Sequence, residues 1–495
     1  MAQQKKLLLV TAAWGDWHVS KHVDINVPTL LADGNFPALS AHCEITYLIY
    51  TSQPDLERMR RAPALQGLSR FAKIEFRLIA ADKMQDPIAT HHKLWAKATE
   101  QAIKEQSFIL NMPPDAAWSN GSFRHVGHML EAGKKAIFMT YLRAESESFA
   151  AAIRGYRQSN SDAISISGAQ LVDICLHALH PLMAAYMRNS DHFPKHPEMM
   201  LWAVPPDGVL CRVLAREMFA YDPAIIALNS QSLLSTHIDP ALIHVIDDSD
   251  DLFAVSLAPL TKDSDWYSRP RMADPYAISD WWLDYDSWVN DLLVGTKLRW
   301  HCRPVRAQAW RARETGADIF LRRAAAIREG RKLWRIVRSL ACTTVARLLA
   351  TAIQTGAISQ IASGRGGAIV FVPINNAFSE CPENLIDRLH DGAGKRDLVR
   401  IMRRHFVPNE DPVMPMALEE RLRSSGDIKL SAADRTTLRI VVRDGRLEVN
   451  GVRILGASIS SGMQRVYLVE RLLAPLEKTD ATITSVPAFE ETRAQ

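Results

Sequence analysis

Cysteine is scarce in this 495-residue sequence, and the six cysteines lie far apart. None forms a C-x-x-C pair, which argues against zinc-finger and thioredoxin-like sites and favours a reduced, cytoplasmic setting. The apolar run near the N-terminus is short and is followed by Trp14, Gly15 and Asp16, so it resembles a signal peptide poorly. No stretch reaches the roughly 20 apolar residues that a membrane span requires.

Several motifs of nucleophilic and nucleotide chemistry are also missing. The sequence has no G-x-S-x-G and no G-x-x-x-x-G-K-[ST], and Gly364, Gly366 and Gly367 precede an apolar strand instead of following one. After the first apolar run the chain reads TAAWGD, where a Rossmann fingerprint would read G-x-G-x-x-G. These absences argue against a dinucleotide oxidoreductase and leave serine hydrolases and P-loop enzymes without support.

Excess charge is small overall but uneven along the chain. The net charge of +4 does not suggest a nucleic-acid binder, so we expect no nucleic-acid partner. Residues 295–347, however, contain fourteen Lys/Arg against three acids. Apolar residues recur there every three or four positions, which predicts one long amphipathic helix over 317–357 with a cationic face. This helix packs on the catalytic domain, lies peripherally on an anionic membrane at its inner face, or binds a partner.

What is present indicates several domains. The length predicts two or three of them. Fourteen of the sixteen histidines lie at or before His301, so we expect the functional site in the first part. We predict a catalytic domain at 1–300, a basic helical segment at 301–360, a small α+β domain at 361–480 and a flexible tail at 481–495.

The first part alternates between strand-like and helix-like segments. Helices are predicted at 91–106 and 121–133, between short apolar or alternating runs that predict strands at 6–13, 44–52, 73–80, 108–112 and 134–143. This order predicts an α/β fold with an open, mainly parallel sheet flanked by helices. Because ligands bind beyond the carboxyl ends of parallel strands, we expect a rim made of Thr11–Asp16, Thr51–Gln53 and Asn111–Asp115.

Later segments carry recognisable turn signals. Pro181 should split the helical pattern at 167–187, and residues 242–259 read as a strand, an acidic turn and a second strand. Asp444-Gly445 and Asn450-Gly451 separate apolar segments within 436–455, which predicts two tight hairpins.

The stretch NMPPDAAWSNGSF, from Asn111 to Phe123, contains the strongest candidate site. Pro113 and Pro114 should end a strand and present Asp115 at the rim. Gly121 opens the next helix, whose free N–H groups favour an anion. A divalent metal would join Asp115 to a diphosphate there. Alternatively, Asp115 or Ser119 merely caps the helix.

The order of these segments resembles that of the GT-A nucleotide-sugar glycosyltransferases, over roughly residues 5–260. The resemblance implies a nucleotide-sugar donor bound at the rim by Thr11, Ala12, Trp14, Thr51, Lys93, Asp115, Ser119 and Asn120. It also implies a metal-binding Asp-x-Asp motif after the fourth strand. Here Asn111-Met112-Pro113-Pro114-Asp115 stands in its place, so Asp115 alone would provide a carboxylate to Mn²⁺ or Mg²⁺.

Inverting sugar transfer needs a carboxylate that takes the proton from the attacking acceptor hydroxyl, which a polysaccharide, lipid or protein would provide. Asp248 and Asp250 of the acidic stretch IDDSDDLF are candidates for this base. Asp207 is a rival, with Gly208 beside it allowing close backbone approach.

Two other functions stay open. The missing second aspartate is compatible with a non-catalytic scaffold that binds partners through its basic helix. Four histidine pairs with helical spacing are compatible with a metal hydrolase, although no third ligand is fixed by spacing; they are His18/His22, His125/His128, His177/His180 and His192/His196.

Overall fold

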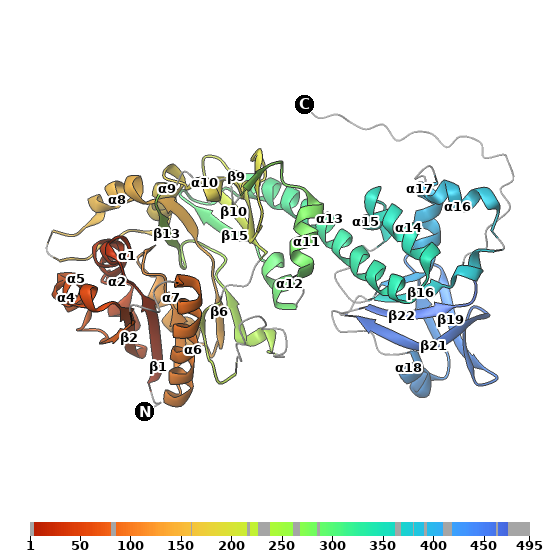
Figure 1. Ribbon diagram of the computed structural model, residues 1–495, viewed down its shortest axis with the longest axis horizontal. Helices are drawn as coiled ribbons and strands as arrows, with labels where there is room; N and C mark the ends of the chain where they lie inside the picture. The colour runs from red at the N-terminus through yellow and green to blue at the C-terminus, as the bar shows by residue number, and fades with distance from the viewer. Residues whose placement is uncertain are drawn as a thin grey trace. The chain divides into compact units, whose positions relative to one another are not determined.

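The computed structural model of the chain, shown in Figure 1, comprises two compact units, Met1–Phe320 and Leu321–Gln495. The boundary falls inside helix α13 (Ala307–Ser339), after the division predicted at residue 300. The predicted tail at 481–495 lies outside the described residues, which are 4–80, 86–159, 161–214, 218–225, 238–260, 268–284, 288–361, 368–379, 381–390, 394–408, 418–461 and 464–473.

Unit 1 is built on a seven-stranded sheet of order β12-β6-β11-β4-β1-β2-β3. Six strands run parallel and β11 runs antiparallel to its neighbours, so the sheet is mixed and mainly parallel. Its strands are β1 (Lys5–Ala12), β2 (Cys43–Thr51), β3 (Lys73–Leu78), β4 (Phe108–Asn111), β6 (Ala136–Phe138), β11 (Met218–Tyr221) and β12 (Ile243–Val245).

Both faces of this sheet are covered, which explains its continuous apolar runs. Alternate residues of β1 enter two different cores: Leu8 packs on one face and Leu9 on the other. Helix α6 (Pro87–Glu105) contributes Ala98 to the first core, and helix α7 (Ser122–Glu131) contributes Phe123 to the second. The predicted helices therefore lie on opposite faces of the sheet.

The strand predicted over 134–143 is two strands in two sheets. β6 stays in the main sheet, whereas β7 (Leu142–Glu145) joins a small sheet of order β5-β13-β7. Its other members are β5 (Ala116–Trp118) and β13 (Ala254–Ala258). β6 is buried throughout, whereas alternate residues of β7 are only half-buried, so the two halves of the predicted strand differ in burial.

The remainder of unit 1 contains short helices, a three-stranded antiparallel sheet of order β15-β10-β9 and a two-stranded sheet formed by β14 and β8. Pro181 separates two helices, as predicted. The strands are β8 (His192–Pro194), β9 (Met199–Val204), β10 (Gly208–Val213), β14 (Ser268–Pro270) and β15 (Leu298–His301), and the helices are α1 (Asp16–Lys21), α2 (Val27–Leu30), α3 (Phe36–Leu39), α4 (Gln53–Arg61), α5 (Pro63–Leu68), α8 (Ser146–Ile153), α9 (Gly168–His177), α10 (Pro181–Ala184), α11 (Pro275–Asp284) and α12 (Trp288–Gly295).

The single basic helix predicted over 317–357 is two helices. α13 ends at Ser339, and α14 (Thr343–Gln354) begins after a break at Ala341, whose φ is 57°. The Cys342 N–H bonds to the Val337 carbonyl, which is the bond that closes a helix with a left-handed residue. Asn375 then accepts from the Thr344 N–H at 3.1 Å and donates to the Ala341 carbonyl at 3.0 Å. The side chain of Asn375, which is distant in sequence, therefore stabilises the break between α13 and α14.

Unit 2 contains a second seven-stranded sheet, of order β17-β16-β22-β21-β20-β19-β18. The two predicted hairpins are confirmed, because Asp444, Gly445, Asn450 and Gly451 all have positive φ. The strands are β16 (Ala368–Pro373), β17 (Phe406–Pro408), β18 (Ile428–Ser431), β19 (Thr437–Arg443), β20 (Arg446–Val449), β21 (Val452–Ser461) and β22 (Gln464–Val469), and the helices are α15 (Ile358–Ile361), α16 (Glu383–His390), α17 (Lys395–Arg404) and α18 (Leu418–Ser425).

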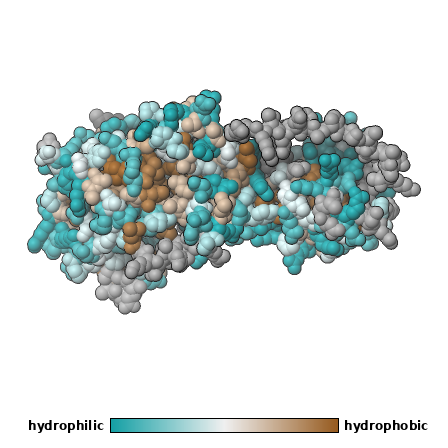
Figure 2. All heavy atoms as spheres, turned by 90° about the horizontal axis from the view of Figure 1, so that it is seen from above, coloured by the Kyte–Doolittle hydropathy of each residue, from teal (hydrophilic) through white to brown (hydrophobic). Residues whose placement is uncertain are grey.

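The apolar side of α13 within unit 2 is buried in protein. A Cβ on Gly330 would lie 2.6 Å from Ile358 Cγ1, so α13 is in contact with α15 at this point. Leu333 and Val337 of α13 are buried. Among the described residues, no helix is long and apolar enough to cross a membrane. Figure 2 shows apolar residues gathered on part of the visible face of unit 1, surrounded by hydrophilic ones.

Candidate active site at the rim of the unit 1 sheet

The carboxyl ends of β1, β2 and β4 meet at one edge of the main sheet, as predicted. The Thr11 hydroxyl donates to the Met112 carbonyl at 2.9 Å and so ties the end of β1 to the residue after β4. Trp14 lies 5.0 Å from the ring of His91, and His91 lies 5.9 Å from the ring of Trp95. The backbone of Ala12 bonds to His91, while burial lowers the pKa of that imidazole. The rim therefore carries a short row of aromatic rings.

The other donor-binding candidates on this side differ in exposure. Thr51 ends β2 and is fully buried, and its hydroxyl has no hydrogen-bond partner among the described residues. Buried polar groups normally find a partner, but this side chain has no exposed surface on which a ligand could bind. Lys93 lies on the exposed side of α6, and no contact in the described structure joins it to the rim.

Asp115 follows β4, as predicted, and is partly buried. Its Oδ2 accepts a hydrogen bond of 3.2 Å from the hydroxyl of Ser256 on β13. Burial raises the pKa of Asp115, while His18 and Arg143 act in the opposite direction. Among the described residues, the groups whose charge acts on Asp115 are therefore a histidine and an arginine. A divalent cation prefers several oxygen ligands, so these residues do not fit the expected Mn²⁺ or Mg²⁺.

Arg143 is the centre of a polar group that the sequence did not reveal. It lies on β7, in register with Ser256 of β13. Its Nε is buried and has no partner among the residues that the structure describes. Its positive charge acts to lower the pKa of Asp115, of His180 and of Glu198. We call Asp115, Arg143, His180, Glu198 and Ser256 the Arg143 cluster.

The other two titratable members of the Arg143 cluster keep their neutral forms more readily than usual. His180 accepts from the Leu182 N–H and faces the Pro259 carbonyl at 3.2 Å, and burial lowers its pKa. Glu198 comes from the loop before β9, and desolvation of its carboxyl raises its pKa although part of the side chain is exposed. A carboxyl with a raised pKa is better matched to proton transfer near neutral pH.

The start of helix α7 does not have the free N–H groups that the sequence predicted for an anion. Asn35 Oδ1 accepts from the N–H groups of Gly121 and Phe123, both at 3.2 Å. The Ser122 N–H bonds to the carbonyl of Ser119. A side chain 86 positions away from Gly121 therefore caps this helix. Neither Asp115 nor the Ser119 side chain does so.

Ser119 and Asn120 take part in bonds that brace the fold. The Ser119 hydroxyl accepts from the Phe253 N–H at 3.1 Å and contacts the Ser122 hydroxyl at 2.8 Å. Asn120 Oδ1 accepts from the Gly34 N–H at 2.7 Å. Their polar atoms are thus already used by neighbouring loops.

Asp207 is buried and ion-paired. Arg306 Nε donates to its Oδ2 at 2.8 Å, and only 1% of the residue is exposed. The predicted close approach at Gly208 is present, because a Cβ there would lie 2.1 Å from the Trp300 carbonyl oxygen. Asp207 is therefore a carboxylate whose charge is already paired with an arginine that follows β15.

Asp248, Asp250 and His301 form a group whose ligand atoms lie within 4.8 Å of one another. His301 Nε2 bonds to Asp248 at 2.9 Å, and its Nδ1 faces the Arg303 carbonyl at 3.0 Å. The hydrogen bond to Asp248 raises the pKa of His301, and despite burial the same bond lowers the pKa of Asp248. The Asp248 carboxylate and the Arg303 carbonyl both accept from the His301 ring, which favours its imidazolium form. Asp248 and His301 therefore satisfy each other's charge and hydrogen bonding. Their charged neighbours differ from those of Asp115.

The helical histidine pairs do not come together as metal sites. Within the described part of the chain, no group of three potential ligands includes any of the four pairs. His22 is buried with a pKa lowered by burial to about 4, and His125 instead contacts His244, with 3.0 Å between their Nε2 atoms. These contacts speak against the metal hydrolase.

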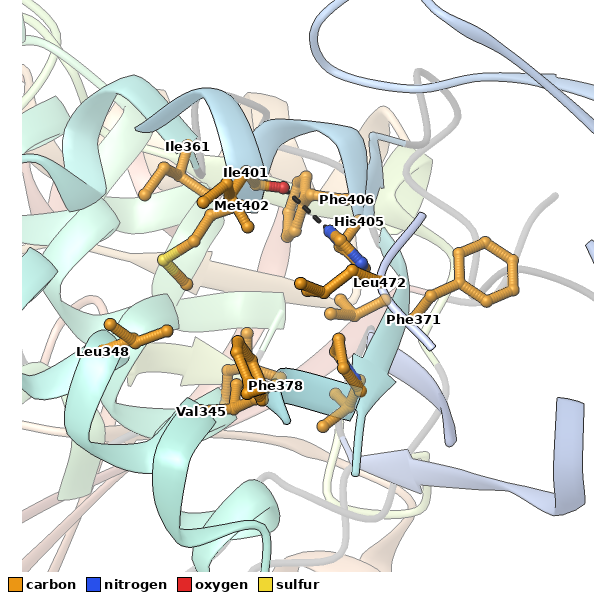
Figure 3. Close-up of a pocket in the computed structure, with 14 residues that line it drawn as sticks. Val345, Leu348, Ile361, Phe371, Phe378, Ile401, Met402, His405, Phe406 and Leu472 are labelled. Atoms are coloured by element: carbon orange, nitrogen blue, oxygen red, sulfur yellow. Dashed lines mark hydrogen bonds between the residues drawn. The ribbon is translucent and has the colours of Figure 1, made fainter. Parts of the chain in front are cut away.

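Unit 2 encloses a small apolar cavity, which Figure 3 shows. Its volume is about 40 Å³, and aliphatic and aromatic side chains line it together with His405. His405 Nδ1 donates to the Ile401 carbonyl at 2.8 Å, and its Nε2 accepts from the Leu473 N–H at 2.9 Å. Both nitrogens are therefore used in holding the core, and burial lowers the pKa of His405 to about 4.

Comparison with known proteins gives matches of different extent. Residues 341–475 match the model of the Fasciclin domain. Protein sll1483 of Synechocystis is 24% identical over 127 residues, which are 26% of this chain and 66% of that protein. This chain covers 45% of a FAS1 domain pair from the insect cell adhesion molecule Fasciclin I, with 13% identity over 26% of its own length and a TM-score of 0.21.

Two structures of S. aureus TarS align over most of the chain with little similarity. Residues 1–349 of TarS give 10% identity and a TM-score of 0.25, covering 90% of this chain and 96% of that one. The longer TarS structure gives 8% identity and a TM-score of 0.23, covering 92% and 65%.

Proposed function

We propose that unit 1 is a glycosyltransferase domain, which moves a sugar from a nucleoside diphosphate donor to a hydroxyl of a polysaccharide, lipid or protein. The Arg143 cluster is the observation that carries this proposal. An arginine whose buried Nε has no partner among the described residues acts on the carboxyls of Asp115 and Glu198, close to the carboxyl ends of parallel strands. Ligands of such sheets bind at that edge, and the planar guanidinium suits a diphosphate.

Different residues of the rim are suited to bind different parts of the donor. The Trp14–His91 ring pair offers a surface on which a base stacks. Arg143 neutralises the diphosphate directly, in the place of the metal that the Asp-x-Asp motif would hold. The resemblance in the order of the segments supports the same assignment.

Glu198 is the base that fits this arrangement best. It takes the proton of the acceptor hydroxyl as that oxygen bonds to the anomeric carbon. The bond from that carbon to the diphosphate oxygen breaks, and Arg143 stabilises the charge on the leaving diphosphate. Asp207 is engaged with Arg306, and Asp248 with His301, so both are weaker bases for this role. Asp250 is largely exposed, and its charged neighbour is His301.

A thermal-stability panel of UDP, GDP, CDP and dTDP, with and without Mn²⁺, tests the proposal. A ligand that binds only the folded state adds about 2.7 kcal/mol to the unfolding free energy at a hundredfold excess over Kd. We expect one nucleotide to stabilise the protein without metal, and Arg143→Gln to remove the effect. Arg154→Gln, at an exposed arginine of the same unit, is the matched control. If no nucleotide stabilises the protein, the proposal fails.

The Fasciclin-domain match favours a second candidate, a non-catalytic scaffold that binds a protein partner in an adhesion-type role. The missing second aspartate agrees with it. This alternative predicts no nucleotide affinity, together with a stable complex in pull-down experiments that Arg331→Glu with Arg335→Glu disrupts. Salt-sensitive pelleting with anionic liposomes tests peripheral membrane contact through 317–357, and no pelleting at low salt would exclude it.

A further inference from the structure

Unit 2 has a cationic hollow that neither the proposed function nor the matched family accounts for. Its volume is about 430 Å³, which is within the range of ligand sites. We call it the arginine hollow. Three of its arginines come from one side of helix α17, and the fourth comes from the turn before β19; the lining residues are Arg396, Val399, Arg400, Arg403, Asp434 and Arg435.

The charges of the arginine hollow are only partly neutralised by protein. Asp434 is its one acid, and Arg404, outside the lining, donates to that carboxylate at 2.8 Å. Arg403 Nε donates a hydrogen bond of 3.0 Å to the Ala433 carbonyl, so this arginine is already engaged by protein. Arg396 and Arg435 are exposed, and neither side chain has a hydrogen bond or ion pair with another described residue. The hollow therefore keeps an excess of positive charge.

Two local features of the hollow work against stability. Arg435 has a φ of 70°, in the left-handed region that costs a residue with a Cβ about 1 kcal/mol or more. Arg396 lies in the first turn of α17, where the helix dipole disfavours a cation. Local choices that oppose the fold mark functional positions more often than chance would place them. Both unfavourable residues point to a ligand of negative charge.

We propose that the arginine hollow binds phosphate groups of a phosphate-bearing polymer. The planar fork of an arginine matches two phosphate oxygens at once, and four arginines around one concavity suit a group that projects into it. A membrane surface fits less well, because Val399 is the only apolar lining residue and nothing there would insert among lipids. Unit 2 as a whole has 27 Lys/Arg against 19 Asp/Glu, which attracts a polyanion to it.

The test uses the full chain and inorganic polyphosphate, with binding measured by isothermal titration calorimetry at low and high salt. We expect Arg396→Gln with Arg435→Gly to weaken binding about tenfold or more, because the variant loses two charge-assisted contacts. Arg443→Gln with Arg446→Gln, which removes two exposed arginines at the hairpin of β19 and β20, is the charge-matched control and should keep the affinity.

Each other outcome overturns the proposal. Equal weakening by both double variants would mean that only the total charge matters. Equal affinity for dextran sulfate would exclude a preference for phosphate. Pelleting with phosphatidylglycerol vesicles that depends on the hollow, without polyphosphate binding, would assign the site to a membrane. Unfolding does not imitate the expected result, because glycine at position 435 accepts the positive φ and should keep or raise the melting temperature.

Discussion

The two units of this chain differ in the kind of charge that they carry. Unit 1 has 32 Lys/Arg against 36 Asp/Glu and contains fourteen of the sixteen histidines, whereas unit 2 has an excess of eight positive charges and two histidines. Histidines and carboxyls with raised pKa values move protons near neutral pH, while arginines keep a fixed charge. The difference agrees with the two proposals, a reaction in unit 1 and charge-based binding in unit 2.

The two sheets differ in a way that agrees with this division. The mainly parallel sheet of unit 1 brings the ends of several strands to one edge, where side chains far apart in sequence meet. The sheet of unit 2 is largely antiparallel, and tight two-residue turns close its hairpins. Its polar hollow lies instead beside helix α17.

The largest expected effect is on the reaction proposed for unit 1. Arg143→Ala leaves Asp115 and Glu198 without their shared cation and removes the group that stabilises the leaving diphosphate. We expect turnover to fall about 10²–10³-fold, as when an oxyanion-stabilising donor is lost. Initial rates with the nucleotide-sugar identified by the panel measure this, and polyphosphate binding by unit 2 should not change. A variant with normal turnover would remove Arg143 from the site.

The next effect concerns pH, because each unit contains a buried histidine whose pKa is lowered. Burial lowers the pKa of His22 and of His405 to about 4, below the ordinary 6.5. The unfolded chain then binds a proton that the folded chain does not, so stability is lost as pH falls from about 6.5 to 4. The cost is about 3 kcal/mol per histidine.

His405→Gln should change the pH dependence of the stability of unit 2 and leave that of unit 1 unchanged. We expect the pH dependence of unit 2 to flatten between pH 6.5 and 4, while unit 1 keeps its slope through His22. Chemical denaturation across this pH range measures both slopes. An unchanged slope for unit 2 would show that His405 is not the responsible group.

Two glycines allow each unit to be destabilised separately. A Cβ on Gly168 would lie 2.1 Å from the Ser249 carbonyl oxygen in unit 1, and one on Gly330 would lie 2.6 Å from Ile358 Cγ1 in unit 2. We expect each alanine substitution to cost about 1–3 kcal/mol in its own unit, and more at Gly168, because backbone moves less easily than a side chain. Differential scanning calorimetry should show one transition lowered in each variant. A shift of both transitions would mean that the units do not unfold separately.

The smallest effect is a gain in stability. Gly316 lies inside helix α13 with nothing within 4 Å of an added Cβ. Gly316→Ala should therefore add about 1 kcal/mol to the stability of unit 1 by helix propensity alone. The same calorimetry measures this gain, and a loss of stability would contradict the open surroundings of this residue.

Features that depend on local pattern were predictable from the sequence. The apolar runs indicated most strands of the main sheet but not β11, Pro181 indicated a helix boundary, and Asn450-Gly451 required a tight hairpin turn. Each of these rests on the conformations open to neighbouring residues, which the sequence states directly. The position of Asp115 after β4 follows from the same reasoning.

Features made by distant partners were not predictable. Asn35 caps α7 from another part of the chain, and Asn375 stabilises a break at Ala341, a residue that normally continues a helix. Glu198 reaches Arg143 from a loop more than fifty positions later. A charged residue at the end of the apolar run 134–143 was the available signal for Arg143, because buried strands rarely end on an arginine without a partner.

Ligand-specific calorimetry of the full chain tests the central claim, that the two units hold two different phosphate sites. Gly168→Ala and Gly330→Ala first assign one transition to each unit. We predict that the nucleoside diphosphate raises only the transition of unit 1 and that polyphosphate raises only that of unit 2. If both ligands shift the same transition, or neither shifts any, the assignment of reaction to unit 1 and phosphate-polymer binding to unit 2 is wrong.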